Sequence, residues 1–111
     1  DGGPAALRAV EYAARRSLLR GLQCHLVTVA AAGAAPSLEQ PAAMLRGGGL
    51  EVVTAVLQGE AEHAISAYVG AAAIDLLAMG AYGHTRIRSL LVGSTTTALL
   101  RACRVPVLVF R

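Results

Sequence analysis

Glycines and hydroxyl-bearing residues recur at a fixed spacing between residues 78 and 98. Gly80 and Gly83 follow an apolar stretch, and Gly93 stands directly before Ser94 and a run of threonines. Glycine lets the backbone turn sharply, and its N–H group can approach a ligand without obstruction from a Cβ atom. The polar run opens an apolar-periodic segment, so it falls at a helix N-terminus, where unpaired N–H groups and the helix dipole attract anions. These residues predict a phosphate-binding site.

Polar residues around this stretch have two interpretations each. His84 and Arg86 follow the second glycine and can neutralise a phosphate, although solvated loop charges give the same pattern. Ser94, Thr95 and Thr96 fit phosphate ligation and simple helix capping equally well. We expect no metal site, because the other histidines have no cysteine or carboxylate at ligand spacing, and we expect no catalytic residues.

Helices and strands alternate along the chain, because apolar residues recur at helical spacing between short β-branched runs. Glycines are expected to stop the first helix at Gly21 and the second at residues 47–49. This order predicts a parallel sheet with right-handed crossovers and a ligand at the carboxyl ends of the strands. The predicted helices span 5–20, 37–46, 61–72 and 94–102, and the predicted strands span 22–30, 50–57, 74–79 and 105–110.

One strand is missing from this order. A chain of this type is expected to begin with a strand, and Asp1 stands where the loop after that strand belongs. We expect the strand to precede residue 1 in a longer chain, because a gap inside a sheet would leave strand edges unpaired. Residues 1–111 are then a single domain that is truncated at its N-terminus.

Composition excludes several classes of protein. The chain is 55% hydrophobic and 15% charged, which argues against disorder and favours a sheet covered on both faces by helices. The net charge of +3 comes from scattered arginines without lysine, and only 4% of residues are aromatic, so nucleic acid is not an expected partner. No apolar run is long enough for a membrane span. Two lone cysteines in apolar settings suggest a reducing, cytoplasmic location.

The glycine spacing resembles the nucleotide-binding signature of the universal stress protein family. The matching pattern is Gly80-x2-Gly83-x9-Gly93-Ser94 followed by a small polar residue. Asp1-Gly2-Gly3 is similar to the Asp-Gly-Ser loop after the family's first strand, although it lacks the capping hydroxyl. The ending, residues 105–109, resembles the Pro-Val-Leu-Val close of the family's last strand, so the resemblance covers the whole chain.

The resemblance implies a Rossmann-like α/β domain, a three-layer α/β/α sandwich whose parallel sheet usually has the strand order 3-2-1-4-5. It also implies an ATP site, optionally with Mg²⁺, and a homodimer or tandem pair formed through the last strand, Val105 to Phe110. Asp1 and Val29 would flank the adenine and ribose. Met79 and Gly80 would line the passage from base to phosphate. The phosphate contacts carried over by this resemblance are Gly83, Gly93, Ser94, Thr95 and Thr96.

Three functions remain open at this point. In the first, ATP is a conformational ligand of a stress-response domain, and its occupancy alters the dimer or a partner surface. In the second, the same site hydrolyses ATP slowly or transfers phosphate, although no residue stands out as a general base. In the third, the domain binds no nucleotide and serves as a structural pairing module.

Overall fold

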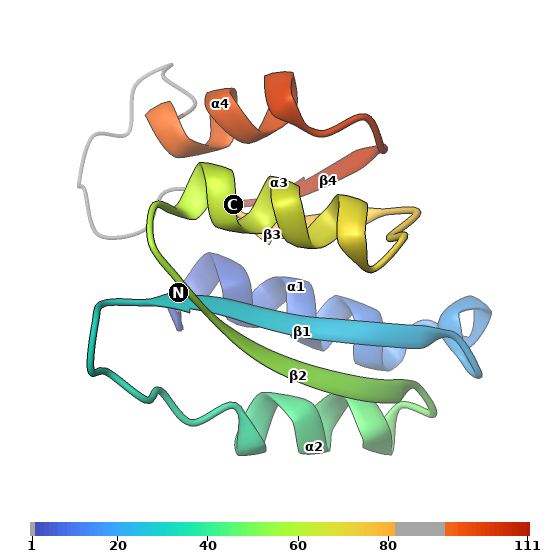
Figure 1. Cartoon of the computed structure of the whole chain (residues 1–111). Coiled ribbons are helices and arrows are strands. Elements are labelled where there is room, and N and C mark those ends of the chain that lie inside the picture. The colour runs from blue at the N-terminus through green and yellow to red at the C-terminus, as the bar shows by residue number, and fades with distance from the viewer. Residues whose placement is uncertain (1, 82–92) are drawn as a thin grey trace.

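The computed structural model describes residues 2–81 and 93–111 (Figure 1). Within these residues helices and strands alternate, and a short 3₁₀ turn, η1 (Ser17–Leu19), follows the first helix. The helices are α1 (Pro4–Arg15), α2 (Glu39–Gly47), α3 (Ala61–Ala71) and α4 (Ser94–Ala102). The strands are β1 (Gln23–Ala30), β2 (Glu51–Gln58), β3 (Leu77–Gly80) and β4 (Val107–Phe110).

The strands form two parallel pairs, which confirms the predicted α/β class. Strand β1 pairs with β2 from Gln23↔Glu51 to Ala30↔Gln58. Strand β3 pairs with β4 from Leu77↔Val107 to Gly80↔Phe110. No ladder joins the two pairs within the described ranges, so the complete order 3-2-1-4-5 stays a prediction.

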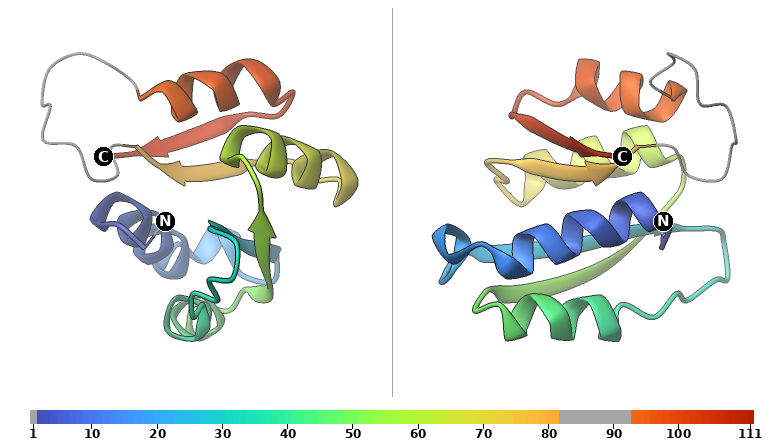
Figure 2. Two further views of the ribbon diagram at one scale, coloured as in Figure 1. Left: turned by 60° about the vertical axis from the view of Figure 1, so that its left-hand side comes forward. Right: turned by 180° about the vertical axis from the view of Figure 1, so that it is seen from behind.

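Helices cover both faces of the strands, which gives the predicted three layers. On one side α1 contacts α2 and lies across β3 and β4, while α2 packs on β2. On the other side α3 contacts α4 and reaches across to β1 and β2. The helices therefore connect the two strand pairs from both faces, as the two views of Figure 2 show.

The inner edges of β1 and β3 have no strand beside them among the described residues. The chain exposes 7609 Å², whereas a compact monomer of this mass exposes roughly 5,700 Å². The core is correspondingly small, and its largest fully buried side chains are Leu45 and Leu99. A strand between β1 and β3 would pair both edges, and its presence in a longer chain stays a prediction.

The first helix ends five residues earlier than predicted. Arg16 has φ −90° and ψ 111°, which is extended backbone, and η1 then replaces the last predicted turn. Gly21 adopts φ +79°, but its N–H group donates to the carbonyl of Gly49 rather than capping α1. The prediction that Gly21 caps this helix is therefore wrong, because its N–H group bonds instead to the loop that follows α2.

The third strand begins three residues later than predicted. Residues after α3 continue to turn, because Ala73 adopts φ +51° and the N–H group of Ile74 donates to the carbonyl of Val69. Asp75 therefore lies in the turn and not in the strand. The apolar sequence alone could not reveal that the N–H groups of these residues bond to carbonyls at the C-terminal end of α3.

The glycine stop after α2 is confirmed, and one of its residues has a packing role. Helix α2 ends at Gly47, and Gly49 adopts φ +88°. A Cβ atom on Gly48 would collide with the backbone carbonyl of Ala14 in α1. Glycine at position 48 therefore allows α1 and α2 to pack closely, which the sequence pattern did not indicate.

Candidate functional site

The predicted phosphate site lies where strands end and helices begin. Within the described part of the chain all four strands end, and all four α-helices start, on the same edge of the molecule, at the left of Figure 1. Parallel strands joined by antiparallel helices produce this polarity, and it gathers the N-terminal ends of the helix dipoles at one edge. The edge therefore favours a ligand with negative charge.

Helix α4 presents unpaired N–H groups at this edge. Its first internal hydrogen bond runs from the N–H group of Thr97 to the carbonyl of Gly93, at 2.9 Å. The N–H groups of the three preceding residues consequently have no acceptor within the helix. None of the described side chains caps this terminus. Ser94 and Thr95 are exposed, while Thr96 is buried, so the first two hydroxyls are the ones accessible to a ligand.

Gly93 has no conformational or packing requirement for glycine within the described structure. Its φ of −55° and ψ of 154° suit any residue. A Cβ atom built on it has no described atom within 4 Å. A ligand that approaches this backbone from outside would explain why residue 93 is glycine, because a glycine N-cap leaves the first helical N–H groups open to a ligand.

Gly80 has a different reason for being glycine. It is the last residue of β3 and pairs with Phe110, so it does not turn the chain as the sequence suggested. A Cβ atom there would lie 2.5 Å from the backbone nitrogen of Ala6 and 2.8 Å from the carbonyl carbon of Ala5. Gly80 therefore lets the start of α1 rest directly on the end of β3.

Val29 and Met79 occupy corresponding places on the two strand pairs. Each is half-buried and stands one residue before the end of its strand. Both thus lie at the edge where the helices begin, although no ladder joins their strands among the described residues. Their position beside a bound base stays a prediction. Four other predicted site residues lie outside the described residues: Asp1, Gly83, His84 and Arg86.

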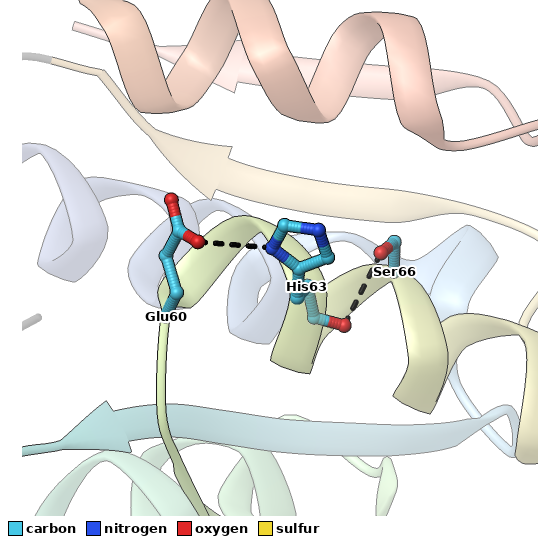
Figure 3. A network of polar contacts seen from close by, with 3 residues as sticks. All are labelled: Glu60, His63 and Ser66. Carbon is cyan, nitrogen blue, oxygen red and sulfur yellow. Dashed lines mark hydrogen bonds and ion pairs between the residues drawn. The ribbon is translucent and has the colours of Figure 1, made fainter.

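A polar group at the start of α3 is the other candidate on this edge. The Nδ1 atom of His63 lies 3.0 Å from an Oε2 atom of Glu60, and the hydroxyl of Ser66 donates to the His63 carbonyl (Figure 3). The side chains of His63 and Glu60 are 79% and 71% exposed, so the ion pair adds little stability. Glu60 is the N-cap residue of α3, where its charge complements the helix dipole. This arrangement is a helix start rather than a catalytic pair.

One partly buried polar contact was missed by sequence reasoning. The Nδ1 atom of His25 on β1 lies 2.8 Å from the hydroxyl of Tyr68 on α3, and the two rings meet edge to face. Gln23 contacts the other ring nitrogen at 3.1 Å. The contact joins β1 to α3 across 43 residues of sequence, and no local pattern could signal it.

Cysteines and metal ligands offer no second centre in the described part of the chain. Both Cys24 and Cys103 are free thiols. Burial raises the pKa of the Cys24 thiol, so less of it is the reactive thiolate at neutral pH. Among residues 2–81 and 93–111 no group of three metal-ligating side chains comes together. None of the described helices has the length and apolar character needed to cross a membrane.

Comparison with known proteins identifies the family. The model of the universal stress protein family matches residues 37–111. The chain belongs to the universal stress protein family. A universal stress protein of Synechocystis sp. is 41% identical over 115 residues, which cover all of this chain and 40% of that protein. The universal stress domain described here thus spans well under half the length of this curated relative.

Solved structures confirm the Rossmann-like fold. A hypothetical protein whose biochemical function was assigned from its structure superposes with a TM-score of 0.86 at 20% identity, covering 99% of this chain and 90% of that one. A universal stress protein in complex with cAMP gives 0.75 at 23% identity and covers 100% and 90%. The universal stress protein from Archaeoglobus fulgidus in complex with dAMP gives 0.74 at 19% identity and covers 100% and 91%.

Proposed function

We propose that this universal stress domain binds ATP at the edge formed by β1, β3 and the start of α4. The nucleotide acts as a regulatory ligand of the stress response, and its occupancy alters the dimer or a partner surface. In this proposal Val29 and Met79 face the adenosine half of the ligand. Gly93, Ser94 and Thr95 hold the phosphates.

The observation that carries the proposal is the open N-terminus of α4. Its unpaired N–H groups, two exposed hydroxyls and a glycine without a packing role form a donor set that suits phosphate oxygens. The cAMP and dAMP complexes of related folds support an adenine nucleotide as the ligand class. A triphosphate places its negative charge beside the gathered helix N-termini, which favours ATP over a neutral nucleoside.

We expect Mg²⁺ to enter this site only together with the nucleotide. Mg²⁺ requires oxygen ligands and is often held by one or two carboxylates together with substrate phosphates. The described residues offer no cluster of carboxylates for it. We therefore expect phosphate oxygens and water to supply its ligands, and ATP binding to persist, although weakened, when Mg²⁺ is chelated.

Titration calorimetry of the purified protein with ATP, AMP and adenosine tests the proposal. We expect ATP to bind most tightly and adenosine most weakly, because the phosphate contacts are the main source of binding free energy. Replacing Ser94 or Thr95 by alanine removes one hydroxyl from the phosphates, and we expect each change to weaken ATP binding about tenfold. Thr54→Ala, which removes an exposed hydroxyl from β2, is the matched control and should leave the affinity unchanged. An ATP affinity equal to that of adenosine, or a loss that the control shares, would contradict the phosphate site.

Turnover separates a regulatory ligand from a substrate. The described residues at this edge provide N–H and hydroxyl donors but no buried carboxylate or histidine to activate water. We therefore expect bound ATP to be recovered intact after many times the dissociation half-time. Multiple-turnover release of inorganic phosphate would instead support the hydrolytic alternative.

We also propose that two copies, or two domains of one longer chain, pair through the outer edge of the last strand. Strand β4 is paired only with β3 in the described structure. Its Leu108 and Val109 side chains are 41% and 37% exposed. An open strand edge with apolar side chains favours pairing with another strand. Val109→Pro removes a backbone donor from β4, so sedimentation should show a shift toward monomer if this edge forms the interface.

A further inference from the structure

A groove on the outer surface of α1 carries aromatic rings and unpaired positive charge. It measures about 560 Å³ and is bounded by one face of the helix and by the end of β4. The four helical residues follow at intervals of three, four and seven, so they lie along a single stripe, and Arg16 comes directly after the helix. We call this the α1 groove, and its lining residues are Arg8, Glu11, Tyr12, Arg15, Arg16 and Phe110.

The centre of the α1 groove is an aromatic pair. The ring centroids of Tyr12 and Phe110 lie 5.3 Å apart at an interplanar angle of 57°. The guanidinium carbon of Arg16 lies 4.4 Å from the centroid of the Tyr12 ring. This cation–π contact orders the guanidinium over the ring and leaves its N–H donors directed at the surroundings. The groove therefore combines an apolar floor with a positioned hydrogen-bond donor.

The charge of the α1 groove is not balanced within the described residues. Three arginines face a single carboxylate, Glu11. None of Arg8, Arg15 and Arg16 forms an ion pair with any described residue, although Glu11 is three and four positions from the first two. The lining thus has an excess of two positive charges that an acidic ligand would neutralise.

We propose that the α1 groove docks an acidic peptide segment that carries an aromatic side chain. Of the lining residues only Phe110 is half-buried and the other five are exposed, so the groove is too open to enclose a small molecule in the way typical of ligand pockets. A second copy of the same groove is a poor occupant, because a two-fold contact would set arginines against arginines. A nucleic acid would place phosphates against Glu11, and three arginines within nine residues form a short track for its backbone.

Helix geometry fixes the spacing of the acidic groups. Arg8 and Arg15 are seven residues apart, which is about 10 Å along the axis. Side chains of an extended peptide alternate between its two faces, so residues i, i+2 and i+4 share one face and span about 13 Å. A segment with acidic side chains four positions apart can therefore reach the long side chains of both arginines, and an aromatic side chain at the middle position meets Tyr12 and Phe110.

Fluorescence anisotropy with a labelled peptide tests this proposal. The probe is Glu-Ser-Phe-Glu-Asp, and the matched neutral peptide is Gln-Ser-Phe-Gln-Asn. We expect the acidic peptide to bind at least about tenfold more tightly at about 0.05 M salt, and this difference to shrink at about 0.5 M salt because exposed charges are screened. Equal binding of the two peptides would overturn the proposal.

Variants locate the binding to the α1 groove. We expect Arg15→Gln and Arg16→Gln each to weaken binding about two- to fivefold, and the double change to glutamate to abolish measurable binding. Arg101→Gln, at an exposed arginine in the last turn of α4, is the charge-matched control for the single changes. Tyr12→Leu keeps an apolar side chain but removes the ring. It should weaken binding of the phenylalanine peptide more than it weakens binding of a peptide that has alanine in place of phenylalanine.

Two further outcomes would also overturn it. One is a loss in Arg101→Gln equal to that in Arg15→Gln or Arg16→Gln, which would show that net charge alone attracts the peptide. The other is tighter binding of oligo(dT) than of the acidic peptide at the same salt, with loss in the glutamate double variant. Circular dichroism and urea midpoints confirm that each variant remains folded, so a loss of binding reports the groove itself.

Discussion

Two glycines of the signature have different physical roles, and one pair of substitutions separates these roles. Gly80 allows α1 to pack closely on β3, because an added Cβ atom would lie 2.5 Å from the Ala6 nitrogen and 2.8 Å from the Ala5 carbonyl carbon. Both neighbours are backbone atoms of a packed helix, so they cannot move aside as a flexible side chain can. Gly93 meets no described atom within 4 Å. We therefore expect Gly80→Ala to reduce stability and Gly93→Ala to reduce nucleotide binding.

The magnitudes follow from the two environments. Overpacking at Gly80 costs about 1–3 kcal/mol, and the reduced entropy of the unfolded chain returns about 0.4–1 kcal/mol. The free energy of unfolding should therefore fall by about 1–2 kcal/mol, which is a substantial part of a total of about 5–15 kcal/mol. At Gly93 the same entropic gain is offset by the poorer N-cap propensity of alanine, so stability should change by less than about 0.5 kcal/mol.

Urea unfolding and calorimetry with ATP provide the two measurements. We expect the Gly80→Ala midpoint to drop and the Gly93→Ala midpoint to stay close to that of the wild type. We expect ATP affinity to fall about tenfold in Gly93→Ala, because its methyl group occupies the space that a phosphate would approach. If Gly80→Ala is as stable as the wild type, α1 does not rest on β3 as described. If Gly93→Ala binds ATP normally, the glycine has no role in the site.

Three more changes test other features of the structure. Gly48→Ala should lower the free energy of unfolding by about 1–2 kcal/mol in urea titrations, because the new methyl group collides with the Ala14 carbonyl; an unchanged midpoint would contradict the close α1–α2 packing. Tyr68→Phe should cost about 0.5–1.5 kcal/mol by removing the hydroxyl that contacts His25, and the same change should cost little in a His25→Ala background, where that contact is already absent. The pKa of Cys24 is raised above its ordinary value of 9.0, so the folded state holds the thiol proton more tightly than the unfolded state. Stability should therefore be constant below about pH 9 and decrease as the pH rises through the higher value; Cys24→Ala should remove this decrease, and a decrease of equal size in the variant would assign it to other groups.

Local sequence patterns determined the class of fold and most of its elements. Helix α4 and the glycine stop after α2 depend on propensity, capping and glycine conformations that act within a few residues, and the sequence predicted both. The parallel arrangement follows from the alternation of helices and strands, because such connections have one favoured hand. The phosphate site was predicted for the same reason, since a glycine before hydroxyl residues at a helix start is a local feature.

Tertiary structure decided what each of these residues contacts. The sequence shows Gly80 and Gly93 as two members of one motif, but only the packing of α1 separates a glycine needed by a helix from one open to a ligand. The contact of Tyr12 with Phe110 joins residues at opposite ends of the chain and creates the α1 groove. No short-range rule encodes such contacts, because they depend on how whole elements pack. The sequence therefore determines the elements and the chemistry they carry, and the packing determines which of those groups meet.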